Sequence, residues 1–353
     1  MYLGREYLYN LVTGKIRGPI AMLLRAFLSV LSFIYGAVVI ILAAFYRIKP
    51  ARLGAKVISV GNITLGGTGK TTFVEYLSGL LSLQGAKVAV LSRGYRRDVA
   101  KFGARSIGDE PAMLQKKLPG VHVVVDKNRI KAAFKAIRDY AAQILILDDG
   151  LQQWRIFKDL EIVMIDAANP FGNHRLLPAG LLREPLNALK RADIFVLTQV
   201  GSCQDTVELT DRLRHLNSKA LIIESIHQPD GFSGVFDANE SLGIDVLKGG
   251  KVLIFSGIGN PQGFENSVTG LGINIIKSIR FADHHDYTQV DIDRIIDEAL
   301  RMNADAVITT HKDAVKISEL QVKGAGILAL NIKLKITKNE TEFNRRLLKL
   351  YSL

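Results

Sequence analysis

Cysteine is almost absent from this sequence: its 353 residues include one, Cys203. A single thiol excludes a disulfide framework and a thiolate zinc site, and it fits a reducing compartment. Low-complexity tracts and internal repeats are also missing. Hydrophobic residues make up 48% of the chain and charged residues 23%, so the chain can build a core and disorder is excluded. At about 150 residues per domain, the length predicts roughly two domains.

Acidic residues are scarce in the first 56 positions. This stretch holds eight basic residues and one acid, Glu6, so it supplies +7 of the formal net charge of +12. Positive charge beside apolar sequence favours anionic lipid headgroups as the partner. No basic stripe interleaved with aromatic residues occurs elsewhere, so we expect no nucleic-acid binding.

Residues 27–45 form a run of nineteen without a charge, between Arg25 and Arg47. A helix needs about 20 apolar residues to cross a membrane. A cleaved signal peptide would have a shorter and earlier run, and a buried helix of a soluble domain would not need basic flanks. We therefore predict a membrane anchor in residues 1–50. Four basic residues lie on each side, so orientation is not readable, and the helix could cross the membrane or lie in it.

Short apolar runs alternate with longer polar stretches after Lys56. The runs predict strands of a parallel sheet covered on both faces, and the alternation predicts right-handed βαβ units. Polar sequence at 201–219 separates two groups of strands, so we predict domains at 51–205 and 206–353. The first group is 57–60, 88–91, 122–125, 144–147, 161–165 and 194–197, with helices at 71–84 and 127–140; the second is 220–224, 252–255, 273–279, 306–308 and 327–330.

A glycine-rich loop follows the first predicted strand and precedes a predicted helix. Residues 64–71 match a Walker A loop, except that Thr64 stands at its first glycine. The backbone of such a loop wraps around phosphates, Lys70 adds a positive charge and Thr71 can place its hydroxyl on Mg²⁺. The strand–loop–helix context disfavours a mere turn. The residues expected to contact a nucleotide are Thr64, Gly66, Gly67, Thr68, Gly69, Lys70, Thr71 and Thr72.

Two acids, Asp148 and Asp149, end the apolar strand 144–147. This is the Walker B pattern, in which a carboxylate at a strand end holds the metal. A turn would be the ordinary alternative, but a phosphate loop in the same sheet favours a metal site. The fold expected is therefore α/β: a P-loop NTPase-type parallel sheet domain and a second, smaller α/β domain, with an N-terminal membrane-associated helix.

Three classes of P-loop protein then compete. A guanine-nucleotide switch needs an Asn/Thr-Lys-x-Asp motif, which neither 198–201 nor 310–313 supplies. A membrane-associated partition ATPase needs a lysine where Leu65 stands. A phosphotransferase remains, and it needs a base near its acceptor hydroxyl. A loop carboxylate at 108–111 and an imidazole at 281–287 are candidates, although spacing alone does not bring them together.

The order and spacing of these motifs resemble the tetraacyldisaccharide 4′-kinase family of lipid A biosynthesis over nearly the whole chain. That family's loop also lacks the first Walker glycine. His311 departs from the Glu expected at its position, which leaves the role of 310–313 open. The matching segments are 59–62 with 66–71, 92–95, 108–111, 128–129, 148–152, 169–172, the run LLPAGLLREP at 176–185, 257–261 and 281–287.

The resemblance implies transfer of the ATP γ-phosphate to the 4′-hydroxyl of a tetraacyldisaccharide 1-phosphate, giving the bis-phosphorylated lipid A precursor. It implies Asp109 as the base, paired with His284, while His285 would be dispensable. Lys70 would hold the β- and γ-phosphates. The residues that would organise Mg²⁺ are Thr71, Glu110, Asp148 and Asp149.

Arginine can bind a phosphate through two parallel hydrogen bonds. Arg129, Arg175 and Arg183, together with Gln152, are therefore candidates to contact the lipid substrate. ATP and an inner-leaflet lipid imply an enzyme of the inner membrane with its catalytic domains on the cytoplasmic side. The alternative is a membrane-tethered P-loop ATPase switch that has no lipid acceptor.

Overall fold

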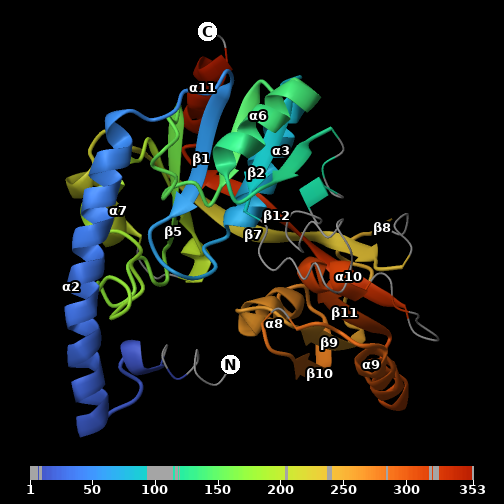
Figure 1. Cartoon of the computed structure of the whole chain (residues 1–353). Coiled ribbons are helices and arrows are strands. Elements are labelled where there is room, and N and C mark those ends of the chain that lie inside the picture. The colour runs from blue at the N-terminus through green and yellow to red at the C-terminus, as the bar shows by residue number, and fades with distance from the viewer. Residues whose placement is uncertain are drawn as a thin grey trace. The chain divides into compact units, whose positions relative to one another are not determined.

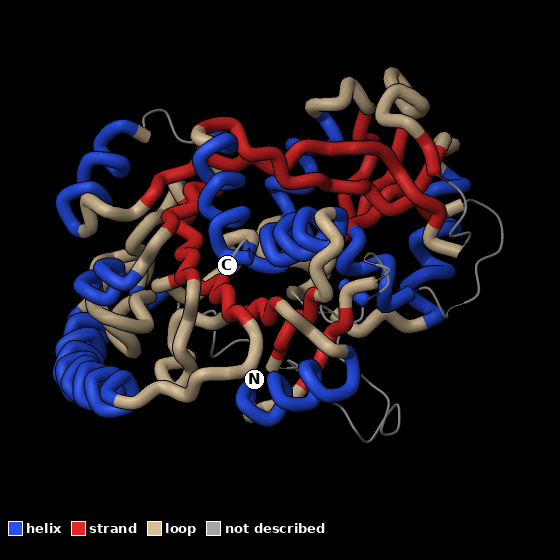
Figure 2. The backbone as a smooth tube through the Cα atoms, turned by 90° about the horizontal axis from the view of Figure 1, so that it is seen from above, coloured by secondary structure: helices blue, strands red, loops and turns tan. Residues whose placement is uncertain are grey.

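The computed structural model describes residues 7, 10–93, 114–115, 118, 120–202, 206–236, 241–283, 285–317, 320 and 326–351. The chain forms two compact units. The first comprises 1–93, 120–226 and 336–353, and the second comprises 94–119 and 227–335. The sequence-based boundary at 205 and 206 thus falls inside the first unit. Strands and helices alternate along most of the described chain (Figure 2), and the predicted α/β class is confirmed.

The first unit is built on a parallel sheet. Its strands are β1 (Lys56–Asn62), β2 (Val88–Ser92), β3 (His122–Val125), β4 (Ile144–Asp148), β5 (Leu160–Asp166), β6 (Ile194–Thr198) and the start of β7 (Leu221–Gly234). They lie in the order β7–β6–β5–β1–β4–β2–β3 and pair in parallel. The six strands predicted here are confirmed to within two residues at either end. Strand order reverses beside β1, which is where parallel α/β sheets bind their ligands.

Both faces of this sheet are apolar, as a parallel sheet requires. All residues of β2, β4 and β6 are buried. The helices of the first unit are α2 (Pro19–Ile48), α3 (Lys70–Leu83), α6 (Arg129–Tyr140), α7 (Val207–Leu216) and α11 (Glu340–Tyr351), with 3₁₀ turns η2 (Leu186–Arg191) and η3 (Val200–Ser202). Phe73 of α3 lies edge-to-face with Phe343 of α11 at 6.0 Å, so the C-terminal helix belongs to this core.

Helix α2 is longer than the uncharged run that predicted it, and it packs along the first unit (Figure 1). Its buried residues include Ser32, Gly36, Val39 and Ala43, whose spacing puts them on one stripe. Among the described residues it is the helix long and apolar enough to cross a membrane, with a mean hydropathy of 2.5 in its most apolar window. Only 17% of that window is buried, so most of the helix surface is apolar and exposed.

The second unit contains a smaller sheet in the order β10–β9–β11–β12–β7, in which β8 (Ser241–Leu242) pairs antiparallel with β7. Its other strands are β9 (Lys251–Ser256), β10 (Asn274–Arg280), β11 (Ala306–Thr310) and β12 (Ile327–Lys338), and its helices are α8 (Pro261–Thr269), α9 (Gln289–Arg301) and α10 (His311–Ile317). The predictions for β7 and β12 were too short: both strands continue into polar sequence. Asp230 of β7 and Lys333 of β12 form an ion pair of 2.5 Å there.

Candidate active site

The glycine-rich loop joins β1 to α3 and is held at its stem. Leu65 N donates to Leu181 O at 2.7 Å, and Arg183 N donates to Ile63 O at 2.8 Å. Thr64 forms an isolated antiparallel bridge with Leu182. The segment around 181–183, part of the longest family-like run, therefore clamps the start of the loop.

The tip of the loop is open. Gly66 has a φ of +131°, a conformation that favours glycine. A Cβ placed on Gly66 or Gly67 would meet no atom within 4 Å. Lys70 begins α3, so the helix N-terminus with its free N–H groups faces the same loop. Thr68 is 3% exposed, and its hydroxyl has no hydrogen-bond partner among the described residues. The loop thus offers donors to an anion.

The acid pair lies beside this loop because two glycines allow close backbone approach. Gly150 N donates to Val60 O at 3.0 Å. A Cβ on Gly61 would lie 2.5 Å from Leu151 N, and one on Gly150 would lie 2.3 Å from Ser59 Oγ. Asp149 itself has a φ of +58°. The turn after β4 therefore bends toward the end of β1.

Asn62, the last residue of β1, connects the loop with the charged groups. Its Nδ2 donates to Thr64 O at 2.7 Å, while its Oδ1 accepts from Lys70 Nζ at 2.9 Å and from Arg183 Nη1 at 3.3 Å. Arg183 Nη1 and Nη2 also donate to the two oxygens of Asp149 at 2.6 and 2.9 Å. Lys70 Nζ lies 3.7 Å from Asp149 Oδ1. The structure thus brings together predicted residues from three distant segments.

These contacts set the charges of the site. Burial opposes ionisation of Asp149, but the bonds from Arg183 and the charges of Lys70 and Arg129 outweigh it, so the pKa of Asp149 lies below its ordinary value. Burial lowers the pKa of Arg129, while the negative charges of Asp148 and Asp149 oppose that shift. Asp148 is the last residue of β4 and is 8% exposed. Arginine and lysine side chains thus surround ionised carboxylates at the loop.

Glu184 forms a second buried polar centre next to Arg183. It is 1% exposed, and its Oε1 accepts from Gln152 Nε2 at 3.1 Å, Trp154 Nε1 at 3.3 Å and Arg191 Nη2 at 2.9 Å. Gln152 Nε2 also lies 3.4 Å from Asn62 O. Gln152, a predicted substrate contact, thus uses its amide donors to brace the end of β1.

The other predicted residues are spread more widely. Arg129 is 3% exposed, and its Nη1 donates to Asp126 O at 2.6 Å. Arg175 Nη1 donates to Ser29 Oγ of α2 at 3.0 Å, so it lies against that helix. Thr71 and Thr72 occupy the first turn of α3 and are partly buried. The predicted Asp109, Glu110 and His284 lie outside the described residues.

Helix α2 contacts the segment that carries Arg183. Ser32 Oγ donates to Leu176 O at 2.8 Å, and Tyr35 OH donates to Arg183 O at 2.9 Å. A Cβ on Gly36 would lie 2.6 Å from Leu176 Cδ1. Asn62, Tyr35 and Glu184 were assigned no role from sequence; the one signal for Tyr35 was a hydroxyl inside an uncharged run.

In the second unit, the 281–287 segment is fixed by aromatic and polar contacts. His285 stacks on Phe281 with ring centroids 4.6 Å apart, and its Nε2 lies 3.2 Å from Asp291 Oδ2. Asp291 forms a capping box with Thr288 at the start of α9. The contacts described for His285 are thus with its own segment and this helix cap.

The 310–313 segment binds the turn after β9. Asp313 is fully buried, and its Oδ2 accepts from Gly257 N at 3.1 Å and from Thr310 Oγ1 at 2.7 Å. Burial and the negative charge of Asp313 raise the pKa of Tyr287. Asn260 caps α8 by accepting from Gly263 N at 3.0 Å. Asp313 therefore ties α10 to the family-like 257–261 turn.

A lysine at a helix N-terminus, a glycine-rich loop and a strand-end acid pair at one edge of a parallel sheet define a P-loop nucleoside-triphosphate-binding protein. The profile of the family described as tetraacyldisaccharide-1-P 4′-kinase matches residues 24–352. The chain belongs to this family, which makes it a kinase that acts on a hydroxyl group and confirms the assignment drawn from its motifs.

Relatives agree over most of the chain. It is 38% identical to a tetraacyldisaccharide 4′-kinase of Halothermothrix orenii over 344 residues, which cover 90% of this chain and 89% of the relative. A relative of the same name from Anaeromyxobacter sp. strain Fw109-5 is 40% identical over 308 residues, covering 82% and 81%. The crystal structure of LpxK from Aquifex aeolicus in complex with ATP has 30% identity and a TM-score of 0.73, covering 93% of this chain and 99% of that one.

Proposed function

We propose that this chain transfers the γ-phosphate of ATP to the 4′-hydroxyl of tetraacyldisaccharide 1-phosphate and produces the bis-phosphorylated lipid A precursor. The observation that carries the proposal is the cluster of Lys70, Asn62, Asp149 and Arg183 at the phosphate loop, in a member of this kinase family. We divide the chain into a membrane segment at 1–50, a nucleotide-binding domain at 51–205 and a second domain at 206–353.

The site fits a nucleotide and Mg²⁺. The open face of Gly66 and Gly67, the unpaired hydroxyl of Thr68 and the helix N-terminus would receive phosphate oxygens. No group of three His, Cys, Asp or Glu side chains among the described residues could hold a metal alone. Mg²⁺ is usually bound by one or two carboxylates together with substrate phosphates, and Asp148 and Asp149 supply such a pair.

When bound, Mg²⁺ would offset the negative charge that develops on the transferred phosphoryl group. We assign Thr71, Asp148, Asp149 and Glu110 to hold it. Lys70 would hold the β- and γ-phosphates and leave Asp149 for them. Since Arg183 binds both oxygens of Asp149, we assign it to orient that carboxylate.

For the acceptor, we assign Asp109 as the base that receives the hydroxyl proton, with His284 as its partner. A positioned base contributes about 10²–10⁴ in rate. Arg129 and Arg175 are the arginines that we assign to the substrate phosphate. Gln152, which braces Asn62 and Glu184, would act on the substrate through the geometry of that strand end.

The docked position of α2 supports association with one side of the membrane. Ser32 and Tyr35, in the middle of the helix, bind the backbone of the kinase unit. A helix bound in this way cannot also have its middle surrounded by lipid on all sides. Its opposite side carries exposed Phe27, Phe33 and Ile41, which suits insertion into one leaflet as an amphipathic helix does. We place the enzyme on the cytoplasmic side of the inner membrane.

The test is transfer of γ-³²P from ATP to purified tetraacyldisaccharide 1-phosphate in detergent micelles. We expect a labelled bis-phosphorylated lipid with the wild type. Lys70→Ala should lower the rate about 10²–10³-fold, by analogy with other preorganised electrostatic contacts. Asp109→Ala should lower turnover with little change in ATP affinity. ATP hydrolysis without labelled lipid would favour the alternative, a membrane-tethered ATPase switch.

A further inference from the structure

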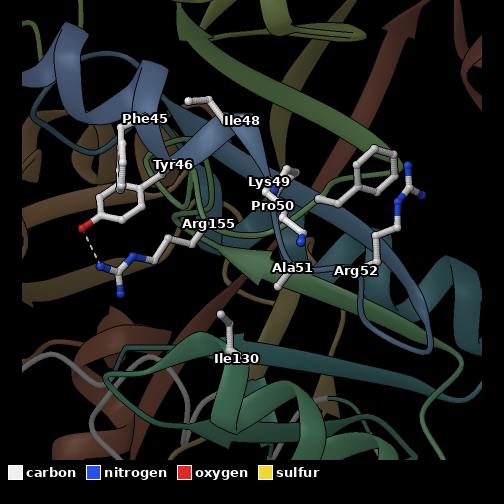
Figure 3. A pocket seen from close by; sticks show the side chains of 10 residues that line it. Phe45, Tyr46, Ile48, Lys49, Pro50, Ala51, Arg52, Ile130 and Arg155 are labelled. Carbon is white, nitrogen blue, oxygen red and sulfur yellow. Dashed lines mark hydrogen bonds between the residues drawn. The ribbon is translucent and has the colours of Figure 1, made fainter.

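A hollow of about 1090 Å³ lies in the first unit where α2 ends and the chain turns toward β1 (Figure 3). Phe45 and Ile48 from the last turns of α2 form part of its wall, and Phe157, just before β5, forms another part. Phe45 is 65% exposed and Ile48 is 80% exposed. The hollow is therefore continuous with the exposed apolar surface of α2.

Three cations line this hollow: Lys49, Arg52 and Arg155. None of its lining residues is acidic. Within the described chain, these cations form no ion pair; both arginines instead lie over aromatic rings. The Cζ of Arg52 is 3.8 Å from the ring centroid of Phe157. The Cζ of Arg155 is 4.1 Å from the ring centroid of Tyr46, whose hydroxyl accepts a hydrogen bond from the same guanidinium.

An arginine held in this way is prepared to bind an anion. The ring covers one face of the guanidinium and leaves its N–H groups, which lie in the plane, free for an acceptor. Guanidinium geometry matches phosphate, and Lys49 adds a point charge. The wall of Phe45 and Ile48 suits hydrocarbon. Phosphate and hydrocarbon together are the chemistry of a phospholipid.

We propose that this hollow binds the phosphate headgroup of an acidic phospholipid of the bilayer, with its acyl chains along Phe45 and Ile48. Three cations without an acid favour an anionic headgroup over a zwitterionic one. Arg52 precedes β1 and Lys70 follows it, and a strand of seven residues spans roughly 20 Å. The bound lipid would thus be a bilayer lipid and not the phosphate acceptor. The inference rests on the membrane association proposed above.

The test is sedimentation of the full-length protein with phosphatidylcholine vesicles that contain or lack phosphatidylglycerol. The variant is R52Q/R155Q, and the matched control is K131Q/K135Q, which removes two exposed cations from α6. We expect R52Q/R155Q to lower partition onto phosphatidylglycerol vesicles about 30-fold and K131Q/K135Q to lower it far less. On phosphatidylcholine alone, the three proteins should bind equally. Equal loss in both variants would overturn the proposal, since charge alone would then explain it.

Two further arms keep the outcome clear. R52K/R155K retains the charges, so it should retain most of the binding; if it loses as much as R52Q/R155Q, the hollow acts by packing and the proposal is wrong. Inorganic phosphate should show no saturable binding that R52Q/R155Q abolishes; such binding would identify a free anion as the ligand. Kinase activity in micelles should be equal in wild type and R52Q/R155Q. Absence of that activity in the wild type would refute the proposed function while leaving the vesicle result intact.

Discussion

Replacing Arg183 by Lys tests how the active site holds Asp149. Arg183 donates one hydrogen bond to each oxygen of Asp149, at 2.6 and 2.9 Å. Lysine keeps the positive charge but lacks the planar fork that binds both oxygens at once. The substitution therefore removes the orientation of the carboxylate while it preserves the net charge of the site.

The magnitude follows from the lost bond. A hydrogen bond to a charged group contributes about 1.5–3 kcal/mol. The side chains of Arg183 and Asp149 are 21% and 39% exposed, so solvent screens part of that contribution. If about 1–2 kcal/mol of positioning is lost in the transition state, kcat should fall roughly 5- to 30-fold.

The pH dependence gives an independent sign. Arg183 helps to lower the pKa of Asp149, and the ionised carboxylate is the form that the mechanism uses. Weakening this contact raises the pKa, so the acidic limb of kcat should move to higher pH. For stability, a depressed carboxyl pKa contributes above its ordinary value and the contribution disappears as the pH falls through the folded-state pKa. Arg183→Lys should therefore narrow the stability difference between neutral and acidic pH.

The assay is the initial rate of lipid phosphorylation in micelles across acidic and neutral pH, with thermal denaturation in parallel. Arg138→Lys is the matched control, because Arg138 also binds both oxygens of an aspartate, Asp139, but on the exposed surface of α6. We expect the control to match wild type in rate and pH profile. An Arg183→Lys enzyme with an unchanged kcat and an unmoved acidic limb would refute the assignment of Arg183.

Three further changes probe other parts of the molecule. Tyr35→Phe removes the hydrogen bond from α2 to Arg183 O and should lower kcat a few-fold without changing vesicle binding; a loss of binding alone would show that Tyr35 serves only the anchor. Gly180→Ala would place a Cβ 2.1 Å from Arg175 O and should lower the free energy of unfolding by about 2–4 kcal/mol, measured by denaturant titration; wild-type stability would contradict the close approach. Asp313→Ala leaves Gly257 N and Thr310 Oγ1 without their buried acceptor and should destabilise the second unit by about 2–4 kcal/mol, while ATP affinity, measured by calorimetry, stays unchanged; weaker ATP binding would assign this segment to the nucleotide site.

Strands of the first unit were readable from sequence because each is a short apolar run that must be buried on both faces. Helix α3 and its loop were readable because glycines, Lys70 and a preceding strand occur together within a few residues. The same local information failed for β7 and β12, whose later residues are polar. Asp230 and Lys333 lie in strands because each strand has the other as a partner, which is a property of the fold and not of either segment.

The sequence by itself determined the family, the phosphate loop, the acid pair and the presence of a long apolar helix, since each depends on residues close together in the chain. Only the tertiary structure decided that Arg183 binds Asp149, that Asn62 joins both cations, and that α2 lies against the kinase unit through Ser32 and Tyr35. These contacts join residues far apart in the sequence. Their partners are selected by sheet order and by close backbone approach at Gly61 and Gly150, which no local pattern records.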